Sequence, residues 1–447
     1  HTVQEVIKSA LKLARNAAGN QAYVALDIGS TGRVMYPSGD ASFSEIYDAV
    51  AEMVIAGKNL CDVILLETFT DLHELKAGVL AARENSDLPI FATMSFEESG
   101  RTFFGASVGA MTATLEGLGI DALGVNCSLG PKQLVPIVER FCAYSHIPVM
   151  VQPNAGLPVM RDGKSYYDVT PGEFAEISCK FAEMGANILG GCCGTTPEHI
   201  KAISDVLKNY SPRLPNKPDY DYDGVPFSPT GLEPFIYDGN QNFVMIGERA
   251  NVTGSKKFAK LIREGNFAEA VEITKKQVLN GANIIDVCMD SDMSDSKSDM
   301  VKFLNLISSE PDIARVPVMI DSSDFDVIVA GLKSVQGKSI VNSISLKVGE
   351  EEFCRQAKII KELGGIAVVM TFDENGQAMG IKDRVKIVDR AYNILTKDCG
   401  YLPSEIIFDL NVFPLATGIS EHNNNAINFI EALKILKKKF VIYIIII

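Results

Sequence analysis

The chain has 447 residues, of which 47% are apolar and 22% are charged, a composition that excludes wholesale disorder. Lys and Arg number 42 against 56 Asp and Glu, and the resulting net charge of −14 argues against a nucleic acid or an anionic membrane as partner. No apolar run reaches the ~20 residues of a membrane-spanning helix. The length suggests about three ordinary domains, or two if they are large α/β barrels.

Nine cysteines are a low and odd number for a chain of this length. Secreted domains held together by disulfides are shorter and richer in cysteine. We therefore expect free thiols, a reducing compartment and a cytoplasmic location.

The first part of the chain alternates short apolar runs with amphipathic helical stretches, which is typical of parallel βα units. The expected strands are Tyr23–Asp27, Val63–Glu67, Ile90–Ser95, Ala122–Asn126, Val149–Gln152 and Asn187–Gly191. The expected helices include Thr2–Ala18, Phe43–Ala56, Leu72–Glu84 and Pro171–Met184. Before the last of these, Thr170 can cap the helix, with Glu173 three residues on, and the pair predicts a capping box.

Residues 210–242 interrupt this alternation. The segment contains six prolines among glycine, aspartate and tyrosine residues, and we place the domain boundary in it. Because its Tyr and Phe side chains are poorly suited to water, we expect this linker to lie along the protein surface. The predicted domains are therefore residues 1–209 and 243–447.

The βα alternation resumes after the linker. The expected strands are Phe243–Glu248, Asn283–Val287, Pro317–Asp321, Ser339–Ser343, Ala367–Phe372 and Ile406–Leu410, and helices such as Phe267–Asn280 and Glu350–Leu363 lie between them. About six strands in each half fit either an open doubly wound sheet or part of an eight-stranded barrel.

The positions of polar residues favour barrels, because a βα barrel carries its active site at the C-terminal ends of its strands. Many expected strands end in such residues: Glu67, Asn126, Cys127, Gln152, Cys192, Cys193, Glu248, Asp286, Asp321, Asn342, Asp373, Asp409 and Asn411. For any single residue, a capping or turn role is the simpler explanation. The whole series favours an α/β fold of two (β/α)8 TIM-type barrels in tandem, each incomplete in this chain.

Three of these residues are cysteines at two strand ends. Cys127 follows the fourth expected strand, and the adjacent Cys192 and Cys193 follow the sixth, with glycines on both sides. Zinc favours thiolate ligands, and three protein ligands leave a fourth position open, as in catalytic zinc sites. Such a zinc would lower the pKa of a substrate thiol and deliver a thiolate nucleophile. A buried vicinal pair with an unrelated third thiol explains the spacing equally well.

Several segments of the first domain resemble the homocysteine-binding domain of the zinc-dependent homocysteine S-methyltransferases. They are Leu65–Thr68, Gly124–Cys127, Val151–Pro158 and Gly190–Pro197, and the distance along the chain from Cys127 to Cys192 also fits. The resemblance implies that zinc is bound by Cys127, Cys192 and Cys193. It also implies that homocysteine is bound by Glu67, through its amine, and by Asn126.

The second domain resembles the pterin-binding barrel of cobalamin-dependent methionine synthases, in the segments Ile246–Ser255, Ile320–Ser323, Val341–Ser345 and Phe408–Asp409. The resemblance implies a methyltetrahydrofolate site formed by Gly254, Ser255, Lys256, Asp321, Asn342 and Asp409. Additional candidates for pterin contacts are Glu248, Asn251, Asp286 and Asn411. Asp and Asn side chains offer donors and acceptors to the aminopyrimidine edge of a pterin, and a carboxylate can manage the proton at N5.

The order of the two domains matches the N-terminal half of the cobalamin-dependent methionine synthases. The implied reaction of methionine biosynthesis passes a methyl group from methyltetrahydrofolate to cobalamin and then to the zinc-activated thiolate of homocysteine. Cobalamin is expected on a separate downstream domain of the parent chain. Two alternatives stay open: a cobalamin-independent homocysteine S-methyltransferase with a sulfonium or betaine donor, and an inactive fragment that binds only zinc and folate.

Three features depart from the family pattern. No strand is expected before Tyr23, and the chain ends in a lysine run and isoleucines (residues 437–447) where the family has two more strands. We therefore expect a chain truncated at both ends, without the first strands of the first barrel and the last strands of the second, and with an exposed, aggregation-prone C-terminal segment. Cys288 stands where the family often has asparagine, which either weakens one hydrogen bond to the pterin or is a neutral variant.

Overall fold

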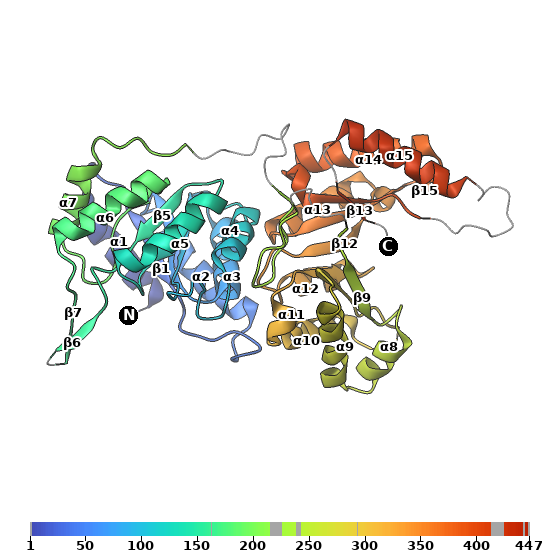
Figure 1. Ribbon diagram of the computed structural model, residues 1–447, viewed down its shortest axis with the longest axis horizontal. Coiled ribbons are helices and arrows are strands. Elements are labelled where there is room, and N and C mark those ends of the chain that lie inside the picture. Colours follow the sequence, from blue (N-terminus) through green and yellow to red (C-terminus); the bar gives the residue numbers. More distant parts are fainter. Residues whose placement is uncertain are drawn as a thin grey trace. The chain divides into compact units, whose positions relative to one another are not determined.

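The chain forms two compact units, His1–Lys217 and Pro218–Ile447, each built on its own parallel sheet (Figure 1). The computed structural model describes residues 2–161, 163–214, 226–237, 243–292, 294–412, 424–440 and 443–445. The division between the units falls inside the segment 210–242. Within the described ranges, no helix is both long and apolar enough to cross a membrane.

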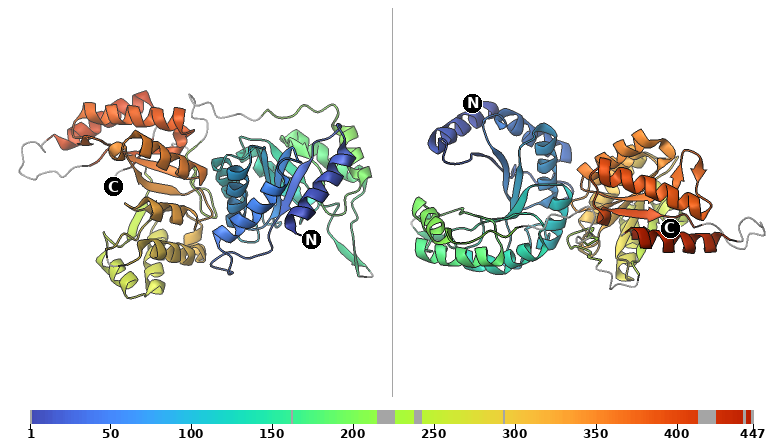
Figure 2. Two further views of the ribbon diagram at one scale, coloured as in Figure 1. Left: turned by 180° about the vertical axis from the view of Figure 1, so that it is seen from behind. Right: turned by 90° about the horizontal axis from the view of Figure 1, so that it is seen from above.

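The first unit is a curled, open sheet with helices on its outer side (Figure 2, right). Its strands follow one another in the order β1 (Ala25–Gly29), β2 (Val63–Phe69), β3 (Ile90–Met94), β4 (Ala122–Asn126), β5 (Val149–Gln152) and β8 (Ile188–Leu189). The helices are α1 (Val3–Ala18), α2 (Phe43–Gly57), α3 (Leu72–Asn85), α4 (Val108–Gly117), α5 (Pro131–Tyr144), α6 (Pro171–Met184) and α7 (Pro197–Leu207). A hairpin of β6 (Val159–Arg161) and β7 (Lys164–Tyr166) precedes α6.

Local sequence signals set where these elements begin. Thr170 accepts a hydrogen bond from the backbone of Glu173, whose carboxylate accepts one from the Thr170 backbone, so the predicted capping box of α6 is confirmed. Strand β1 begins two residues later than Tyr23, because its pairing with β2 starts between Ala25 and Val63. The shift moves the end of β1 to Gly29 and leaves Asp27 inside the strand.

Parallel pairing places the C-terminal ends of β4 and β5 at the same level. Asn126 pairs with Gln152, so the next residue on each strand leaves the sheet at one rim. The two strands approach closely at Gly124, where a Cβ atom would lie 1.7 Å from the carbonyl oxygen of Met150. A larger residue at this position would push apart the strands that carry the rim loops.

The second unit has a seven-stranded parallel sheet that is also not closed (Figure 1). In chain order its strands are β9 (Ile246–Asn251), β10 (Ile284–Cys288), β11 (Val318–Asp321), β12 (Ile340–Ile344), β13 (Ile366–Met370), β16 (Ile406–Asp409) and β17 (Tyr443–Ile445). The helices are α8 (Lys256–Arg263), α9 (Phe267–Leu279), α10 (Ser296–Ser308), α11 (Pro311–Ala314), α12 (Phe325–Leu332), α13 (Glu350–Glu362), α14 (Ile381–Asn393) and α15 (Asn425–Lys439). A short hairpin pairs β14 (Phe372–Asp373) with β15 (Gly376–Gln377). The predicted α/β class with two TIM-type, unclosed barrels is confirmed.

The C-terminal residues correct one expectation. Residues Tyr443–Ile445 form β17, which extends the sheet as a parallel neighbour of β16, and Ile445 is only 6% exposed. The expectation of an exposed segment unrelated to the barrel strands is therefore wrong for these residues. Isoleucine and tyrosine have high strand propensity, and the free edge of β16 offers them hydrogen-bond partners.

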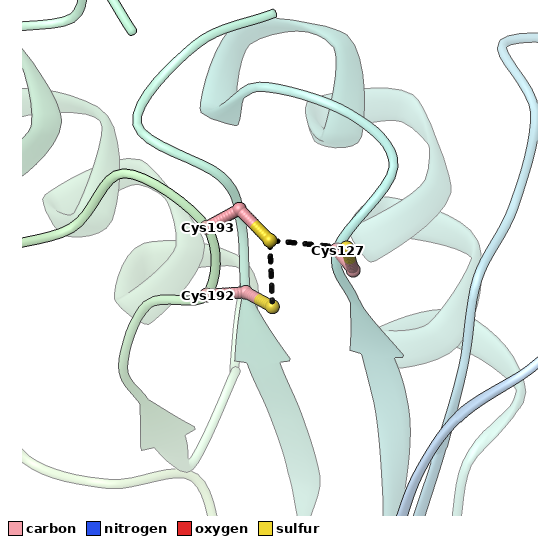
Figure 3. A group of neighbouring side chains, drawn as sticks. All are labelled: Cys127, Cys192 and Cys193. Carbon is pink, nitrogen blue, oxygen red and sulfur yellow. Dashed lines mark hydrogen bonds between the residues drawn. The ribbon is translucent and has the colours of Figure 1, made fainter. Parts of the chain in front are cut away.

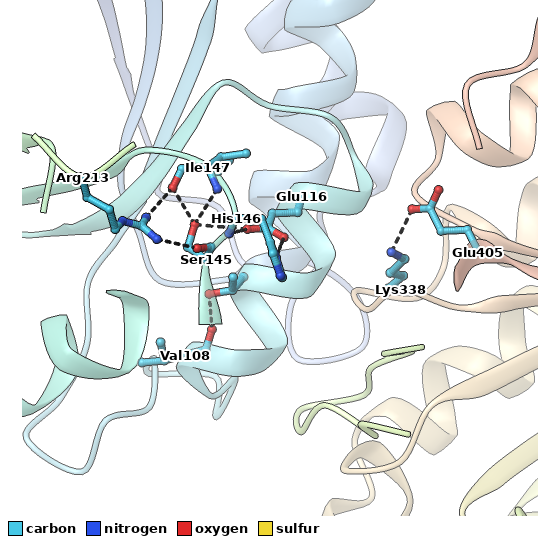
Figure 4. Close-up of polar contacts among 9 residues, drawn as sticks. Val108, Glu116, Ser145, His146, Ile147, Arg213, Lys338 and Glu405 are labelled. Carbon is cyan, nitrogen blue, oxygen red and sulfur yellow. Dashed lines mark hydrogen bonds and ion pairs between the residues drawn. The ribbon is translucent and has the colours of Figure 1, made fainter. Parts of the chain in front are cut away.

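The two parts of the proline-rich segment are held by different units. Arg213 donates hydrogen bonds to the carbonyl oxygens of Ser145 (2.9 Å) and Ile147 (3.0 Å) in the first unit (Figure 4). Phe227 is buried in the second unit against the starts of its strands, and Thr230 donates its backbone N–H to the Lys338 carbonyl oxygen. For Phe227 this agrees with the expectation that the aromatic residues of the linker lie on the protein, whereas Tyr220 and Tyr222 fall outside the described residues.

A cluster of buried charged side chains lies at the N-terminal end of the second sheet. The Glu405 carboxylate lies 2.9 Å from the Lys338 ammonium, as Figure 4 shows, and 2.6 Å from that of Lys361. Burial alone would raise the pKa of Glu405, but the two ammonium groups lower it to about 2. The candidate pterin residues lie at the opposite, C-terminal rim of this sheet.

Candidate functional sites

Three cysteine sulfurs converge at the C-terminal rim of the first unit (Figure 3). Cys127 follows β4, and Cys192 and Cys193 follow β8. The Cys193 sulfur lies 3.8 Å from that of Cys127 and 3.9 Å from that of Cys192, and all three lie within 4.8 Å of one another. The third cysteine is therefore a neighbour of the vicinal pair, which counts against the alternative of an unrelated thiol.

The positions of these sulfurs depend on backbone conformations that few residues adopt. Cys127 and Ser128 have φ values of 59° and 52°, in the left-handed region, so the chain turns sharply as β4 ends. Gly194 has φ of 79°, and a Cβ there would lie 2.2 Å from the ring of Tyr167. A side chain at position 194 would thus displace the loop that carries the cysteine pair.

The donor set fits a zinc ion. Cys127 and Cys192 are half-buried, whereas Cys193 is exposed. A hydrogen bond from Cys192 lowers the pKa of Cys127 to about 5, and the same interaction raises the pKa of Cys192. The site therefore supplies a thiolate at neutral pH within a group of three soft ligands, which suits zinc and leaves a position open.

Asn126 connects the sulfurs to the rest of the rim. Its fully buried amide oxygen accepts hydrogen bonds from the Thr68 backbone and the Thr93 hydroxyl, both at 2.9 Å. The amide nitrogen donates to the Thr68 hydroxyl at 2.6 Å and lies 3.5 Å from Glu67 and 4.0 Å from the Cys192 sulfur. The Asn126 amide is thus hydrogen-bonded to other residues of the protein. Its contact with homocysteine stays a prediction.

Glu67 lies at the same rim and carries a perturbed carboxyl group. Burial, together with the negative charges of Asp27 and Cys127, raises the pKa of Glu67 to about 7. Asp27 was absent from the sequence-based candidates, although it stood at the end of an expected strand and could have been included on that signal. Two neighbouring carboxyl groups beside a sulfur cluster can accept the ammonium group of an amino acid.

A second polar group lies on adjacent strands of the second unit. Asp321 ends β11 and pairs with Asn342 on β12, and on its other side it pairs with Cys288 on β10. Burial raises the pKa of Asp321 to about 6 and raises that of Asp286 well above the usual value. One carboxylate oxygen of Asp286 is buried without a hydrogen-bond partner, which is expected where a ligand supplies a donor.

Asp409 is the last residue of β16 on the same sheet, and Asn411 follows it two residues later. Asn411 has φ of 54°, donates its backbone N–H to the Asp409 carboxylate (2.8 Å) and donates its amide to the Thr371 hydroxyl (2.7 Å). The fully buried Arg384 donates to the carbonyl oxygens of Leu410 (2.7 Å) and Asn411 (3.1 Å). Sequence reasoning missed Arg384, because nothing in a helical run marks which basic residue turns inward.

The remaining pterin candidates lie on or after β9. Gly254 donates its backbone N–H to Asn251 (2.6 Å), Ser255 caps α8, and Lys256 is the exposed first residue of that helix. Glu248 is exposed on β9, and its charge contributes to the raised pKa of Asp321 after burial and the charge of Asp290.

Asp290 is a further residue that sequence reasoning missed. Its carboxylate accepts hydrogen bonds from the hydroxyls of Ser322 (2.6 Å) and Ser323 (2.7 Å), which directly follow Asp321. It lies beyond the end of β10, in the loop after Cys288, so the strand-end signal did not select it. Asp290 fixes the turn after β11 and hence the place of Asp321.

Comparisons with known proteins agree with the division of the chain into two units. Residues 1–207 match the family model of homocysteine S-methyltransferase, and residues 247–445 match that of pterin binding enzymes. Among solved structures, the Escherichia coli homocysteine methyltransferase MmuM in its apo form has 21% identity and a TM-score of 0.38, over 45% of this chain and 73% of that chain. Plasmodium falciparum wild-type HPPK-DHPS with STZ-DHP has 17% identity and a TM-score of 0.33, over 55% of this chain and 43% of that chain.

The two family models account for both units, in the order that the sequence motifs indicated. The chain thus consists of a homocysteine S-methyltransferase domain followed by a pterin-binding domain, which is the architecture of the N-terminal half of methionine synthase.

Proposed function

We propose that this chain is the substrate-activating part of a 5-methyltetrahydrofolate–homocysteine S-methyltransferase of methionine biosynthesis. The first unit binds homocysteine and the second binds 5-methyltetrahydrofolate. The observation that carries the proposal is the convergence of the sulfurs of Cys127, Cys192 and Cys193 in a homocysteine S-methyltransferase domain. Cobalamin, implied as the methyl carrier on another domain, stays a prediction.

In the first unit, Cys127, Cys192 and Cys193 would hold zinc. Bound zinc would lower the pKa of the homocysteine thiol and keep it as a nucleophilic thiolate. Glu67 and Asp27 would accept the ammonium group of the amino acid and so aim its thiol at the sulfur cluster. Asn126 would keep Glu67 and Cys192 in place, since it lies between them.

In the second unit, Asp286, Asp321 and Asn342 would bind the aminopyrimidine edge of the pterin, and the unpartnered oxygen of Asp286 supports this. Asp409 and Asn411 would contact the pterin from β16, and Gly254, Ser255 and Lys256 would contact the folate from the loop after β9. A carboxyl group with a pKa of about 6, such as Asp321, can hold or give a proton near neutral pH. Protonation at N5 makes the methyl group transferable.

Replacement of Cys192 by Ser tests whether homocysteine binds to the first unit and methyltetrahydrofolate to the second. The C192S chain is expected to lose homocysteine binding in calorimetric titration and to keep wild-type affinity for methyltetrahydrofolate. The matched control is Cys142→Ser, a half-buried thiol of α5 in the same unit, which should leave both affinities unchanged. Homocysteine binding that survives in C192S would contradict the proposed site.

A methyl-transfer assay on the wild-type chain separates the alternatives. The proposal predicts transfer from methyltetrahydrofolate to homocysteine that depends on added cobalamin. Transfer from a sulfonium or betaine donor without cobalamin would indicate the cobalamin-independent enzyme. Binding of both substrates without any transfer would indicate a chain that only binds them.

A further inference from the structure

The loop that follows β5 contacts both cysteine loops although it carries no cysteine. We call this loop, Pro153–Gly156, the β5 brace. The Pro153 carbonyl oxygen accepts a hydrogen bond from the Cys192 backbone (2.8 Å), and the Ala155 backbone donates one to the Cys193 carbonyl oxygen (2.9 Å). On the other side, the Asn154 backbone donates to the Leu129 carbonyl oxygen (3.0 Å), two residues after Cys127.

The sheet by itself holds the cysteine pair weakly. Strands β4 and β8, which precede the two cysteine loops, are not neighbours, because β5 lies between them. Strand β8 has only two residues, and its backbone hydrogen bonds to β5 reach no further than Gly190, two residues before Cys192. The spacing of the sulfurs therefore depends on contacts beyond the ends of the strands, and the β5 brace supplies them.

The side chain of Asn154 adds a further hydrogen bond between the brace and the backbone of the cysteine pair. Its side chain is 3% exposed, and its carbonyl oxygen accepts a hydrogen bond from the Cys193 backbone N–H at 3.0 Å. Through its own backbone the same residue is bonded to the Cys127 loop. One buried residue thus connects the loops of all three sulfurs.

We propose that Asn154 is a positioning residue of the sulfur cluster, which sets the distance between Cys193 and Cys127. The part of this inference that concerns zinc rests on the proposed function of the site. The part that concerns sulfur spacing does not need a metal. Loss of a residue that orients metal ligands commonly weakens metal binding 10–100-fold.

The first test measures zinc affinity of the full chain by competition with a chelator. Asn154→Ala is expected to raise the zinc Kd by about 10–100-fold. The matched control is Asn187→Ala. The Asn187 side chain accepts a hydrogen bond from the Val149 backbone N–H (3.2 Å) and donates one to the Arg213 carbonyl oxygen (2.6 Å). These bonds lie at the opposite end of the strands from the cysteines. This control should keep the wild-type Kd, and an equal loss in both variants would overturn the inference.

The second test uses the metal-free chain and dibromobimane, which bridges two nearby thiols. Wild type should form the Cys127–Cys193 bridge, detected by peptide mass spectrometry, and N154A should lose most of it. Asn154→Asp keeps an acceptor for the Cys193 amide and should restore the bridge. If N154A does not fold, Asn154→Ser takes its place, since a serine hydroxyl is too short to reach the amide.

The two tests fail in different ways. A wild-type chain that forms the bridge but binds no zinc would refute the proposed zinc site, while loss of the bridge in N154A would still support the role of Asn154. Wild-type bridging and wild-type zinc affinity in N154A would refute the inference and leave the zinc site intact.

Discussion

The carboxyl group of Asp321, in the proposed folate site, lowers the stability of the fold near neutral pH. Burial, helped by the charges of Asp290 and Glu248, raises the pKa of its carboxyl from 3.8 to about 6. The folded state keeps a proton that the unfolded chain releases, so stability is highest at low pH and falls as the pH rises from about 3.8 to about 6. The full loss is up to about 3 kcal/mol.

Replacement of Asp321 by Asn should therefore remove this pH dependence. D321N is expected to raise the free energy of unfolding at pH 7 by up to about 3 kcal/mol, because the buried amide carries no charge. The same variant should lose methyltetrahydrofolate binding. Denaturant unfolding between pH 4 and 7, followed in the second unit, measures the first effect and calorimetric titration the second.

Asp326→Asn is the control, since this exposed aspartate lies on the helix after β11. It should change the unfolding free energy little and leave folate binding intact. A D321N chain with wild-type folate affinity would remove Asp321 from the proposed site.

Three thiols at strand ends made a zinc site one of two equally good explanations of the spacing, and the family resemblance then favoured it. The residues that position the two sites were harder to predict from the sequence. Asn154 and Arg384 act through hydrogen bonds to backbone groups that are distant in the sequence, and no local pattern marks such bonds. Asp27 ended an expected strand and could have been included by the rule that selected Glu67 and Asp321, whereas Asp290 lies beyond the end of its strand.

Helix α14 positions the loop after β16 through one buried side chain. Arg384 donates to the carbonyl oxygens of Leu410, Asn411 and Met379, at 2.7, 3.1 and 2.8 Å. Arg384→Met would leave buried carbonyl groups without these donors, each at a cost of about 1–3 kcal/mol. We expect R384M to lower the free energy of unfolding by about 3 kcal/mol and to weaken folate binding through Asp409 and Asn411.

Arg390 on the same helix provides the comparison. It pairs with Glu350 and Glu374 at the surface, where an ion pair contributes about 0–1 kcal/mol. Arg390→Met should therefore leave both stability and folate affinity close to wild type. Equal effects of the two substitutions in denaturant unfolding would show that α14 has no special influence on the loop.

At the scale of elements, apolar runs predicted the strands well because buried parallel strands are apolar on both faces. The missed strand, Tyr443–Ile445, follows a lysine run and lacks any turn signal, so its pairing with β16 could not be inferred from local sequence. The limits of β1 were also shifted, because pairing with β2 rather than hydrophobicity decides where it begins.

At the scale of the whole molecule, each unit has its own sheet and its own candidate ligands. The motif order along the chain predicted this arrangement, whereas the extent of each sheet depended on strand pairing that the sequence does not display. A ligand that binds only the folded form of one unit stabilises that unit by about 2.7 kcal/mol at a concentration of 100 Kd. Calorimetric unfolding of the full chain should therefore show two transitions with different ligand responses.

A zinc chelator should lower one transition, and methyltetrahydrofolate should raise the other. C192S should mimic the effect of the chelator, whereas D321N should abolish the response to folate. A single transition shifted by both ligands would contradict the assignment of one ligand to each unit.

The central claim is that Cys127, Cys192 and Cys193 together hold one zinc ion. Zinc-edge X-ray absorption of the purified wild-type chain, with metal content measured on the same sample, tests it most directly. We expect one zinc per chain with three protein sulfur ligands at about 2.3 Å, and loss of stoichiometric zinc in C192S. Zinc bound without sulfur ligands, or unchanged zinc content in C192S, would contradict it.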